Sequence, residues 1–204
     1  MKKIRKKAGY LKEFRKNHET ISIGIIGTVK GCGVTNMVVA IANYLSGITG
    51  KEVSVYENNG SRTFAKMNDY FEGINIVKRN GCTFYSKGSV KLSSLYGEEL
   101  DFVIIDFGAE RLNLGEFNKC NYKIVMGSLE PWNLKLYGEP DNIINIAGEN
   151  KNWSMVFHGY DKSLKRLKKE LKIHIIKRPF IDNPFIIDSR LVEFFEKLLF
   201  EETQ

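Results

Sequence analysis

The sequence predicts an α/β protein with one doubly wound, mainly parallel sheet that carries helices on both faces. Three observations lead to this fold class. Apolar runs of strand length alternate with segments of helical length along residues 21–200. The first runs are apolar at nearly successive positions, as expected of central strands that are buried on both faces. Several runs end in a glycine or an acid, which predicts a polar edge of the sheet.

In the first half of the chain, we expect strands at residues 21–26, 53–57, 74–77 and 82–85, and helices at 35–46 and 62–71. The pairs Ser46-Gly47 and Thr49-Gly50 indicate where the first helix ends. The second strand carries Glu57 at its end, before a turn rich in asparagine and glycine. One or two helical turns are expected within residues 90–96.

In the second half, we expect strands within residues 100–106 and at 122–127, 153–158 and 173–176, and helices at 131–147, 161–171 and 188–200. Pro131 suits the start of a helix, and Pro140 predicts a break or kink inside it. Asp161 suits the N-cap of the next helix. The closing segment has the apolar stripe of a helix that packs on a sheet.

The chain of 204 residues has the length of a single domain, which we place at residues 21–204. Its three cysteines are far apart and form no Cys-x-x-Cys or Cys/His pattern, so we expect neither disulfides nor a zinc site. No apolar run has the length of a membrane span, and the N-terminus lacks the apolar region of a signal peptide. The expected location is therefore the cytoplasm.

Residues 1–20 form a basic N-terminal arm. They supply +6 of the net charge of +7, from eight Lys or Arg residues and two acidic ones. As a helix, the arm would carry apolar side chains along one side and lysines elsewhere. Such a segment is either a solvated tail or a contact for a partner, a nucleic acid or the anionic inner face of the cell membrane.

The most informative stretch is a glycine-dense loop at residues 27–33, between an apolar strand and an apolar helix. This arrangement directs backbone N–H groups and a helix N-terminus toward a phosphate. In the phosphate-loop pattern G-x-x-x-x-G-K-[ST], the best register runs from Thr28 to Thr35. Gly33 and Thr35 match, whereas Thr28 replaces the first glycine and Val34 replaces the lysine.

Two acids are expected at the same edge of the sheet as this loop. Asp106 ends a run of four apolar residues, and Glu57 ends the second strand. Because parallel strands deliver their carboxyl ends to the ligand edge of a doubly wound sheet, both carboxylates are candidates for a ligand site. Asp106 alone would also suit the cap of the following turn.

These residues together resemble the deviant phosphate-loop ATPases related to ParA and MinD, and among them the TadZ/CpaE proteins of pilus assembly. The resemblance covers residues 21–200. It depends on the loop, on Asp106, on the order of the elements and on the segment Asp182-Asn183-Pro184-Phe185. It implies a P-loop fold, ATP and Mg²⁺ as cofactors, a homodimer, and protein partners in a pilus or secretion apparatus.

The resemblance also implies a set of site residues. Nucleotide contacts fall on Gly27, Thr28, Lys30, Gly31, Cys32, Gly33, Val34, Thr35, Asn36, Glu57 and His158. Mg²⁺ falls on Thr35 and Asp106, and Lys30 and Asp106 are the candidates for a catalytic role. Val29 stands where the family has the lysine that reaches across the dimer, one position before Lys30. Asn59 replaces the second of the two acids that follow the second strand in relatives.

The departures from the pattern favour binding over turnover. Backbone amides can still hold an anion, but the loss of a cation at the phosphates removes a main source of catalysis. We therefore expect an ATP-binding protein with a localisation or assembly role that is at most a weak ATPase. The alternatives are a scaffold that binds no nucleotide and a ParA-type DNA partition protein, whose binding would be strongly salt-dependent.

A further alternative is an NAD(P)-binding oxidoreductase. Gly31-x-Gly33-x-x-Asn36 nearly fits the G-x-G-x-x-G pattern, and Glu57 stands where a ribose-binding acid belongs. Against it, Asn36 replaces the third glycine, and the loop is long for the tight turn of that motif.

Overall fold

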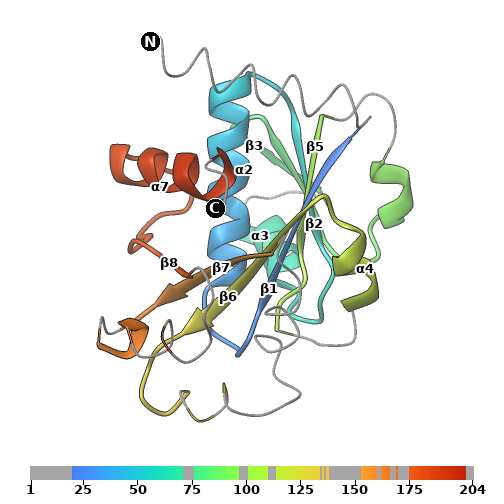
Figure 1. The fold of residues 1–204 in the computed structure, drawn as a ribbon. Coiled ribbons are helices and arrows are strands. Elements are labelled where there is room, and N and C mark those ends of the chain that lie inside the picture. Colours follow the sequence, from blue (N-terminus) through green and yellow to red (C-terminus); the bar gives the residue numbers. More distant parts are fainter. Residues whose placement is uncertain are drawn as a thin grey trace.

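The structure, a computed structural model, describes residues 20–70, 76–96, 101–109, 114–133, 135, 137, 153–159, 162–165, 169 and 175–200. Its centre is a sheet that runs through the whole molecule (Figure 1). The strands are β1 (Ile21–Gly27), β2 (Val53–Glu57), β3 (Ile76–Arg79), β4 (Cys82–Tyr85), β5 (Phe102–Asp106), β6 (Tyr122–Ser128), β7 (Trp153–His158) and β8 (Ile175–Lys177).

The strands lie side by side in the order β3-β4-β2-β5-β1-β6-β7-β8. Every neighbouring pair is parallel except β3 and β4, which form an antiparallel hairpin. The predicted fold class, a mainly parallel α/β sheet, is thus confirmed. Because β1 lies between β5 and β6, the carboxyl ends of these three strands meet at one edge, as the sequence predicts for the loop and Asp106.

Helices cover both faces of this sheet. The described helices are α2 (Val34–Thr49), α3 (Thr63–Tyr70), α4 (Leu114–Lys119) and α7 (Ser189–Phe200), with a 3₁₀ turn, η1, at Leu92–Leu95. The helices α2, α3 and α7 pack on one face and α4 on the other (Figure 1). Among the described residues, no helix combines the length and the apolar character needed to cross a membrane.

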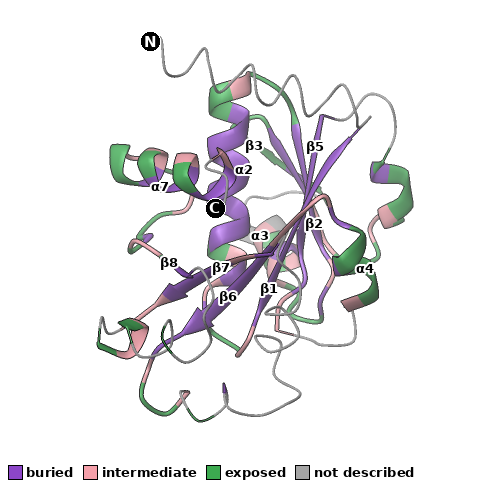
Figure 2. Cartoon of the chain, viewed as in Figure 1, coloured by how far each residue is buried: buried purple, intermediate pink, exposed green. Residues whose placement is uncertain are grey.

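The core explains why the central strands are so apolar. Every residue of β1, β2 and β5 is buried, and the sheet and the inner side of α2 form one continuous buried layer (Figure 2). The rings of Tyr44 in α2 and Phe195 in α7 have centroids 5.1 Å apart. On the other face, Phe117 in α4 makes edge contacts with Phe107 and Trp153. Each such buried aromatic side chain stabilises the fold by about 1.5–3 kcal/mol.

Several boundaries differ from the sequence prediction, each for a local reason. The helix α2 does not end at Ser46-Gly47 but continues to Thr49, because Gly47 fits inside the helix and Gly50 provides the left-handed residue (φ 67°) that ends it. The strand predicted at residues 74–77 is the hairpin strand β3, and the one predicted at 173–176 is β8. The helix α4 was not predicted.

Three predicted segments lie partly or wholly outside the described residues. They are the basic arm at residues 1–20, most of the helix predicted at residues 131–147, and much of the helix predicted at residues 161–171. Within the last of these, residues 162–165 are helical.

Candidate functional site

The loop between β1 and α2 is held at the carboxyl edge of the sheet by both neighbours of β1. The amide of Gly27 donates to the carbonyl of Gly108, which follows β5, at 2.6 Å, and the amide of Thr28 donates to the carbonyl of Met126 in β6 at 2.8 Å. The side chain of Cys32 points back over the strand end, and a Cβ on Gly27 would lie 2.6 Å from its Sγ. The loop is therefore folded tightly onto the end of β1.

Two glycines give the loop its shape. Gly31 has φ 81° and Gly33 has φ 89°, a left-handed conformation that costs other residues about 1 kcal/mol or more. Between them, Cys32 is buried, and burial raises the pKa of its thiol, an effect that Arg178 partly opposes. The neutral thiol lies 3.7 Å from the carbonyl oxygen of Met126. The thiol of Cys32 thus packs on the end of β1 and holds the loop against the sheet.

The helix α2 begins immediately after Gly33, and no side chain caps it. The first N–H groups of a helix have no partner within the helix, and the positive end of the helix dipole adds to their pull on an anion. A cavity of about 460 Å³ lies in front of them. Its lining combines the loop and the start of α2 with the ends of β2 and β5: Val29, Lys30, Gly31, Cys32, Gly33, Val34, Thr35, Asn36, Asn59, Gly60, Ser61, Gly108 and Ala109.

Asp106 is hydrogen-bonded through both oxygens of its carboxylate. Its Oδ2 accepts a hydrogen bond from the hydroxyl of Thr35 at 2.6 Å. Its Oδ1 accepts hydrogen bonds from Asn59 Nδ2 at 2.9 Å and from the amide of Gly108 at 2.8 Å. Burial nevertheless raises the pKa of Asp106 to about 6, because the three donors offset only part of the desolvation and Glu57 adds repulsion. The structure thus brings Thr35 and Asp106 together.

Glu57 is fully buried at the end of β2, and its carboxylate is bonded to the segment that leads into α3. Its Oε1 accepts hydrogen bonds from the hydroxyl of Ser61 at 2.6 Å and from the amide of Thr63 at 2.7 Å. It therefore sits at the start of α3, where an acid interacts favourably with the helix dipole. Glu57 does not line the cavity.

Asn59, rather than Glu57, lines the cavity and contacts Asp106. Its Nδ2 donates to the carboxylate of Asp106 and, at 3.0 Å, to the backbone carbonyl of the same residue. Its Oδ1 accepts from the amide of Ser61 at 2.8 Å. The side chain amide is thus used on both sides and fixes Asp106 relative to the loop after β2.

Of the two candidate residues Lys30 and His158, only Lys30 lines the cavity. Lys30 is exposed and lines the cavity, and among the described residues it forms no ion pair or hydrogen bond. His158, at the end of β7, is half-buried and does not line the cavity. Burial, followed by the charge of Arg178, lowers the pKa of His158, so its imidazole is neutral at neutral pH.

The structure also adds a residue that the sequence prediction missed. Arg178 directly follows β8, and its guanidinium Nη1 lies 3.4 Å from the carbonyl oxygen of Cys32. The signal in the sequence is its position, since it follows the last predicted strand and so belongs to the same edge of the sheet as the loop.

A glycine loop between β1 and α2, a threonine at the helix start and an acid at the end of the neighbouring β5 are arranged as in a phosphate-binding loop. The fold is similar to that of the ParA family ATPase of Chlorobium tepidum TLS, with 13% identity and a TM-score of 0.59 over 80% of this chain and 84% of that one.

Two further solved structures share the fold. One is a plasmid partition protein of Borrelia burgdorferi B31 bound to AMPPNP, with 15% identity and a TM-score of 0.62 over 88% of this chain and 96% of that one. The other is a nucleotide-binding protein of Archaeoglobus fulgidus in complex with ADP, with 18% identity and a TM-score of 0.54 over 90% of this chain and 88% of that one. At these identities the likeness is one of fold. No protein-family model and no curated protein matches the sequence.

The strand order bears on the oxidoreductase alternative. In dinucleotide-binding sheets the first two strands are neighbours. Here β5 lies between β1 and β2. Glu57 is therefore one strand further from the loop than a ribose-binding acid would be, and its carboxylate bonds to the start of α3. The topology disfavours an NAD(P) site.

Proposed function

We propose that this protein binds ATP with Mg²⁺ at the loop after β1 and turns it over slowly or not at all. The observation that carries the proposal is the contact between Thr35 and Asp106 beside the uncapped start of α2. A helix N-terminus binds phosphate through its free amides, and an oxygen pair next to it suits the accompanying cation. Two of the proteins with this fold have AMPPNP or ADP bound, which supports the choice of an adenine nucleotide.

The residues present fit a magnesium ion. Thr35 Oγ1 and Asp106 Oδ2 are oxygen ligands, lie 2.6 Å apart and belong to the two elements that flank the phosphate position. Mg²⁺ binds through few protein oxygens and retains several waters, so two such groups suffice. When bound, the ion supplies positive charge to the phosphates. Without it, the hydroxyl proton of Thr35 links the two oxygens.

Slow turnover follows from two side chains. Val34 stands where a phosphate loop has its lysine, and cations at a transferring phosphoryl group are worth about 10³–10⁵ in rate. Asn59 stands where relatives of the resembled family have an acid near the attacking water, and both ends of its amide are already hydrogen-bonded. An amide cannot accept a proton from water as a carboxylate can.

With slow turnover, ATP acts by staying bound and stabilising one state of the protein, not by supplying the energy of hydrolysis. We propose an ATP-dependent homodimer that localises or assembles other components in the cytoplasm, a pilus or secretion apparatus being the case that the resemblance implies. The basic residues 1–20 would hold the protein on the anionic inner face of the membrane.

A DNA partition role is the second candidate, because one protein of this fold is a plasmid partition protein. The two candidates differ in whether the basic arm binds a membrane or the whole chain binds DNA. Deletion of residues 1–20 should remove binding to anionic liposomes if the arm meets a membrane. Retention of that binding, together with salt-sensitive binding of the whole chain to random-sequence DNA, would favour partition instead.

The main test is the effect of Mg-ATP on thermal stability and a calorimetric titration of the same ligand. A ligand that binds only the folded state raises the melting temperature, by an amount set by its concentration and affinity. Thr35→Ala should reduce this effect, whereas Thr49→Ala, at the other end of the same helix, should not. If millimolar Mg-ATP leaves the melting temperature of the wild type unchanged, the protein is a scaffold that binds no nucleotide.

Association is tested separately. Lys30 is the exposed cation at the rim of the cavity, so Lys30→Ala should abolish ATP-dependent dimerisation in sedimentation experiments while leaving ATP binding in place. Dimerisation unchanged in the variant would exclude this role for Lys30.

A further inference from the structure

The phosphate loop lacks its usual cation, and the exposed Lys30 stands at the rim of the cavity. Val34 occupies the lysine position and is itself buried. A polyphosphate held by backbone amides alone would keep most of its charge uncompensated. The question is therefore which other side chain can bring a positive charge to this point.

Arg178 reaches the loop from the last strand of the sheet. Its backbone amide donates to the carbonyl of Phe157 in β7 at 2.7 Å, which fixes the residue at the carboxyl edge. Its Nη1 lies 3.4 Å from the carbonyl oxygen of Cys32. A Cβ built on Gly33 would lie 2.1 Å from the same nitrogen. The guanidinium is thus pressed against the last two residues before α2.

The guanidinium has little to hold it there. Among the described residues no carboxylate pairs with Arg178, and its Nε is buried without a hydrogen-bond partner. The contact with Cys32 is long for a hydrogen bond. Burial lowers the pKa of Arg178, but an arginine stays charged at any physiological pH. A half-buried cation without an acid carries a desolvation cost that a bound anion would offset.

We propose that Arg178 is the phosphate-binding cation of this site and takes the place of the missing loop lysine. This inference depends on the proposed function, because the ligand is the phosphate chain of the nucleotide. Gly33 both lines the cavity and touches the guanidinium. Arg178 does not itself line the cavity, so its guanidinium has to swing past Gly33 to exchange its long contact with Cys32 for a paired, charge-assisted one with a phosphate over the first amides of α2.

Gly33 has a matching role in this arrangement. A Cβ at this position would displace the guanidinium from its present place against the loop. The glycine that shapes the loop thus also admits the cation from β8.

The experiment is a calorimetric titration of Mg-ATP into the wild type, Arg178→Gln, Arg178→Lys and the control Lys177→Gln. Lys177 is the neighbouring exposed residue and loses the same charge in its variant. Arg178→Gln should weaken Mg-ATP binding about tenfold or more, because the loss of one hydrogen bond between charged groups changes the dissociation constant by about that factor. The control Lys177→Gln should leave the affinity within about twofold of the wild type. The affinity of Arg178→Lys should lie between these two, since lysine keeps the positive charge but lacks the paired N–H donors of the guanidinium.

Two further measurements separate a phosphate contact from a structural role. Urea unfolding without ligand should show that Arg178→Gln is folded. The affinity of the wild type should fall more steeply with added salt than that of Arg178→Gln, because only the wild type has the ion pair.

The outcomes are distinct. If the wild type binds Mg-ATP and Arg178→Gln binds it equally well, the role of Arg178 is wrong and the proposed function stands. Equal salt dependence in the two proteins would also overturn it. If the wild type binds no nucleotide at all, the proposed function fails and this inference fails with it.

Discussion

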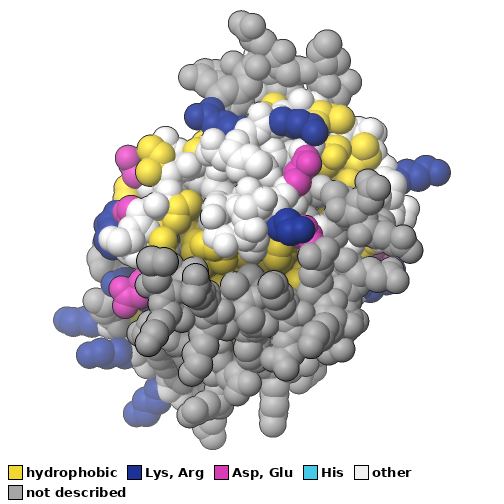
Figure 3. All heavy atoms as spheres, turned by 90° about the horizontal axis from the view of Figure 1, so that it is seen from above, with side chains coloured by type: hydrophobic (Ala, Val, Ile, Leu, Met, Phe, Trp, Pro, Cys, Tyr) yellow, Lys and Arg dark blue, Asp and Glu magenta, His cyan; other side chains and the backbone are white. Residues whose placement is uncertain are grey.

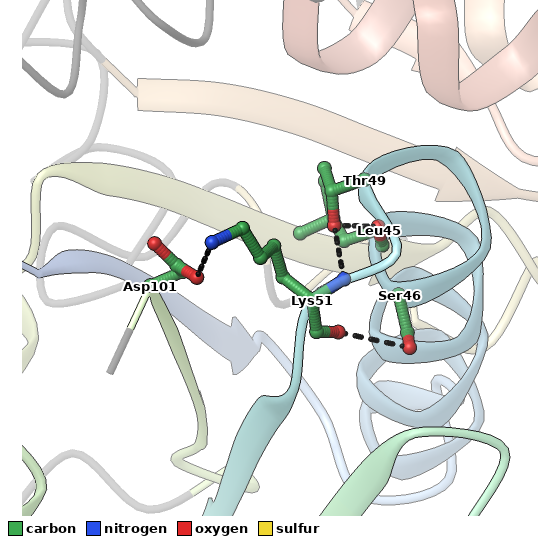
Figure 4. A network of polar contacts seen from close by, with 5 residues as sticks. All are labelled: Leu45, Ser46, Thr49, Lys51 and Asp101. Atoms are coloured by element: carbon green, nitrogen blue, oxygen red, sulfur yellow. Dashed lines mark hydrogen bonds and ion pairs between the residues drawn. The ribbon is translucent and has the colours of Figure 1, made fainter. Parts of the chain in front are cut away.

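The two ends of helix α2 differ in how their polar groups are hydrogen-bonded. At its start, Gly33 provides no capping side chain, and the first amides face a cavity. At its end, Gly50 donates its amide to the carbonyl of Ser46 at 2.8 Å. The hydroxyl of Ser46 donates to the carbonyl of Lys51 at 3.0 Å, and the amide of Lys51 donates to the hydroxyl of Thr49 at 3.2 Å (Figure 4). Only the start of the helix keeps its polar groups for a ligand.

The cavities at these two ends show the same contrast. The larger one, of about 680 Å³, lies at the end of α2, and its cations have partners. Lys51 Nζ lies 3.3 Å from Asp101, Lys78 Nζ lies 3.4 Å from Glu52, and Arg79 stacks on a phenylalanine ring. Seen from this side, blue and magenta side chains lie next to each other (Figure 3).

The smaller cavity, at the start of α2, has the unpaired Lys30 on its rim and Arg178 behind Gly33. Under the proposed function the smaller cavity is the binding site, so volume does not mark it. Its mark is that charges and amides there have no partner among the described residues, and a bound anion can satisfy them.

The largest effect that would sharpen this comparison is expected from Asn59→Asp. It places a third acid against Asp106 and Glu57 and removes the donor that Asn59 provides to Asp106. An uncompensated buried charge costs about 3 kcal/mol or more of unfolding free energy, which urea unfolding at pH 7 would measure. The loss should shrink toward pH 4, where carboxylates take up protons.

Asn80→Asp is the matched control at the other edge. Asn80 is exposed, and its Nδ2 donates to Asn43 at 2.9 Å. Losing that bond should cost about 1 kcal/mol. Equal losses in the two variants would contradict the contrast between the edges.

The pH dependence of stability gives the next test. Burial raises the pKa of Asp106 in the folded protein to about 6, above the 3.8 of an exposed aspartate. Below pH 4 both states are protonated and there is no penalty. Between pH 4 and 6 the unfolded chain ionises first, so this residue makes the protein less stable by up to about 3 kcal/mol, and the penalty is constant above that range.

Asp106→Asn should remove that slope. The difference in unfolding free energy between variant and wild type should therefore rise from pH 4 to pH 6, as measured in urea at several pH values. A difference independent of pH would show that the carboxylate is not desolvated as described. The variant should also lose any Mg²⁺ dependence of ATP binding.

Glycine substitutions compare the two helix ends directly. Gly33 (φ 89°) and Gly50 (φ 67°) are both left-handed, so an alanine costs each about 1 kcal/mol. An added Cβ at Gly33 also meets Arg178, whereas at Gly50 it meets nothing within 4 Å. Each substitution should therefore cost about 1 kcal/mol, but Gly33→Ala should also displace the Arg178 guanidinium and lose ATP binding, whereas Gly50→Ala should retain it. If Gly33→Ala binds ATP as well as the wild type does, the start of α2 does not differ from its end in ligand binding, and the comparison is wrong.

The smallest effect is expected from Lys51→Met. The pair joins a half-exposed lysine to a buried aspartate, so its loss should cost about 1 kcal/mol, the upper value for pairs at the surface. Thermal unfolding should change by no more than a few degrees, and calorimetry should show the same affinity for Mg-ATP. A clear loss of affinity would mean that the far end of α2 is coupled to the loop.

Much of the fold is readable from the sequence because its signals are local. The strands β1, β2 and β5 are buried on both faces, so their apolar runs are nearly continuous. The helix α4 escaped prediction because six residues give too short a pattern to show a helical period. The strand β3 was placed near its position, but its antiparallel pairing depends on a turn at Asn80-Gly81, with φ 52° and φ 72°.

The sequence by itself determined the loop at residues 27–33, the threonine that follows it and the acid at the end of β5, because a phosphate loop is a short pattern at the end of an apolar strand. Only the tertiary structure decided where the other polar groups point. It turned Glu57 toward α3, tied Asn59 to Asp106 and brought Arg178 against Gly33 from a strand far along the chain. Such contacts depend on strand order and side-chain packing, which no local pattern encodes.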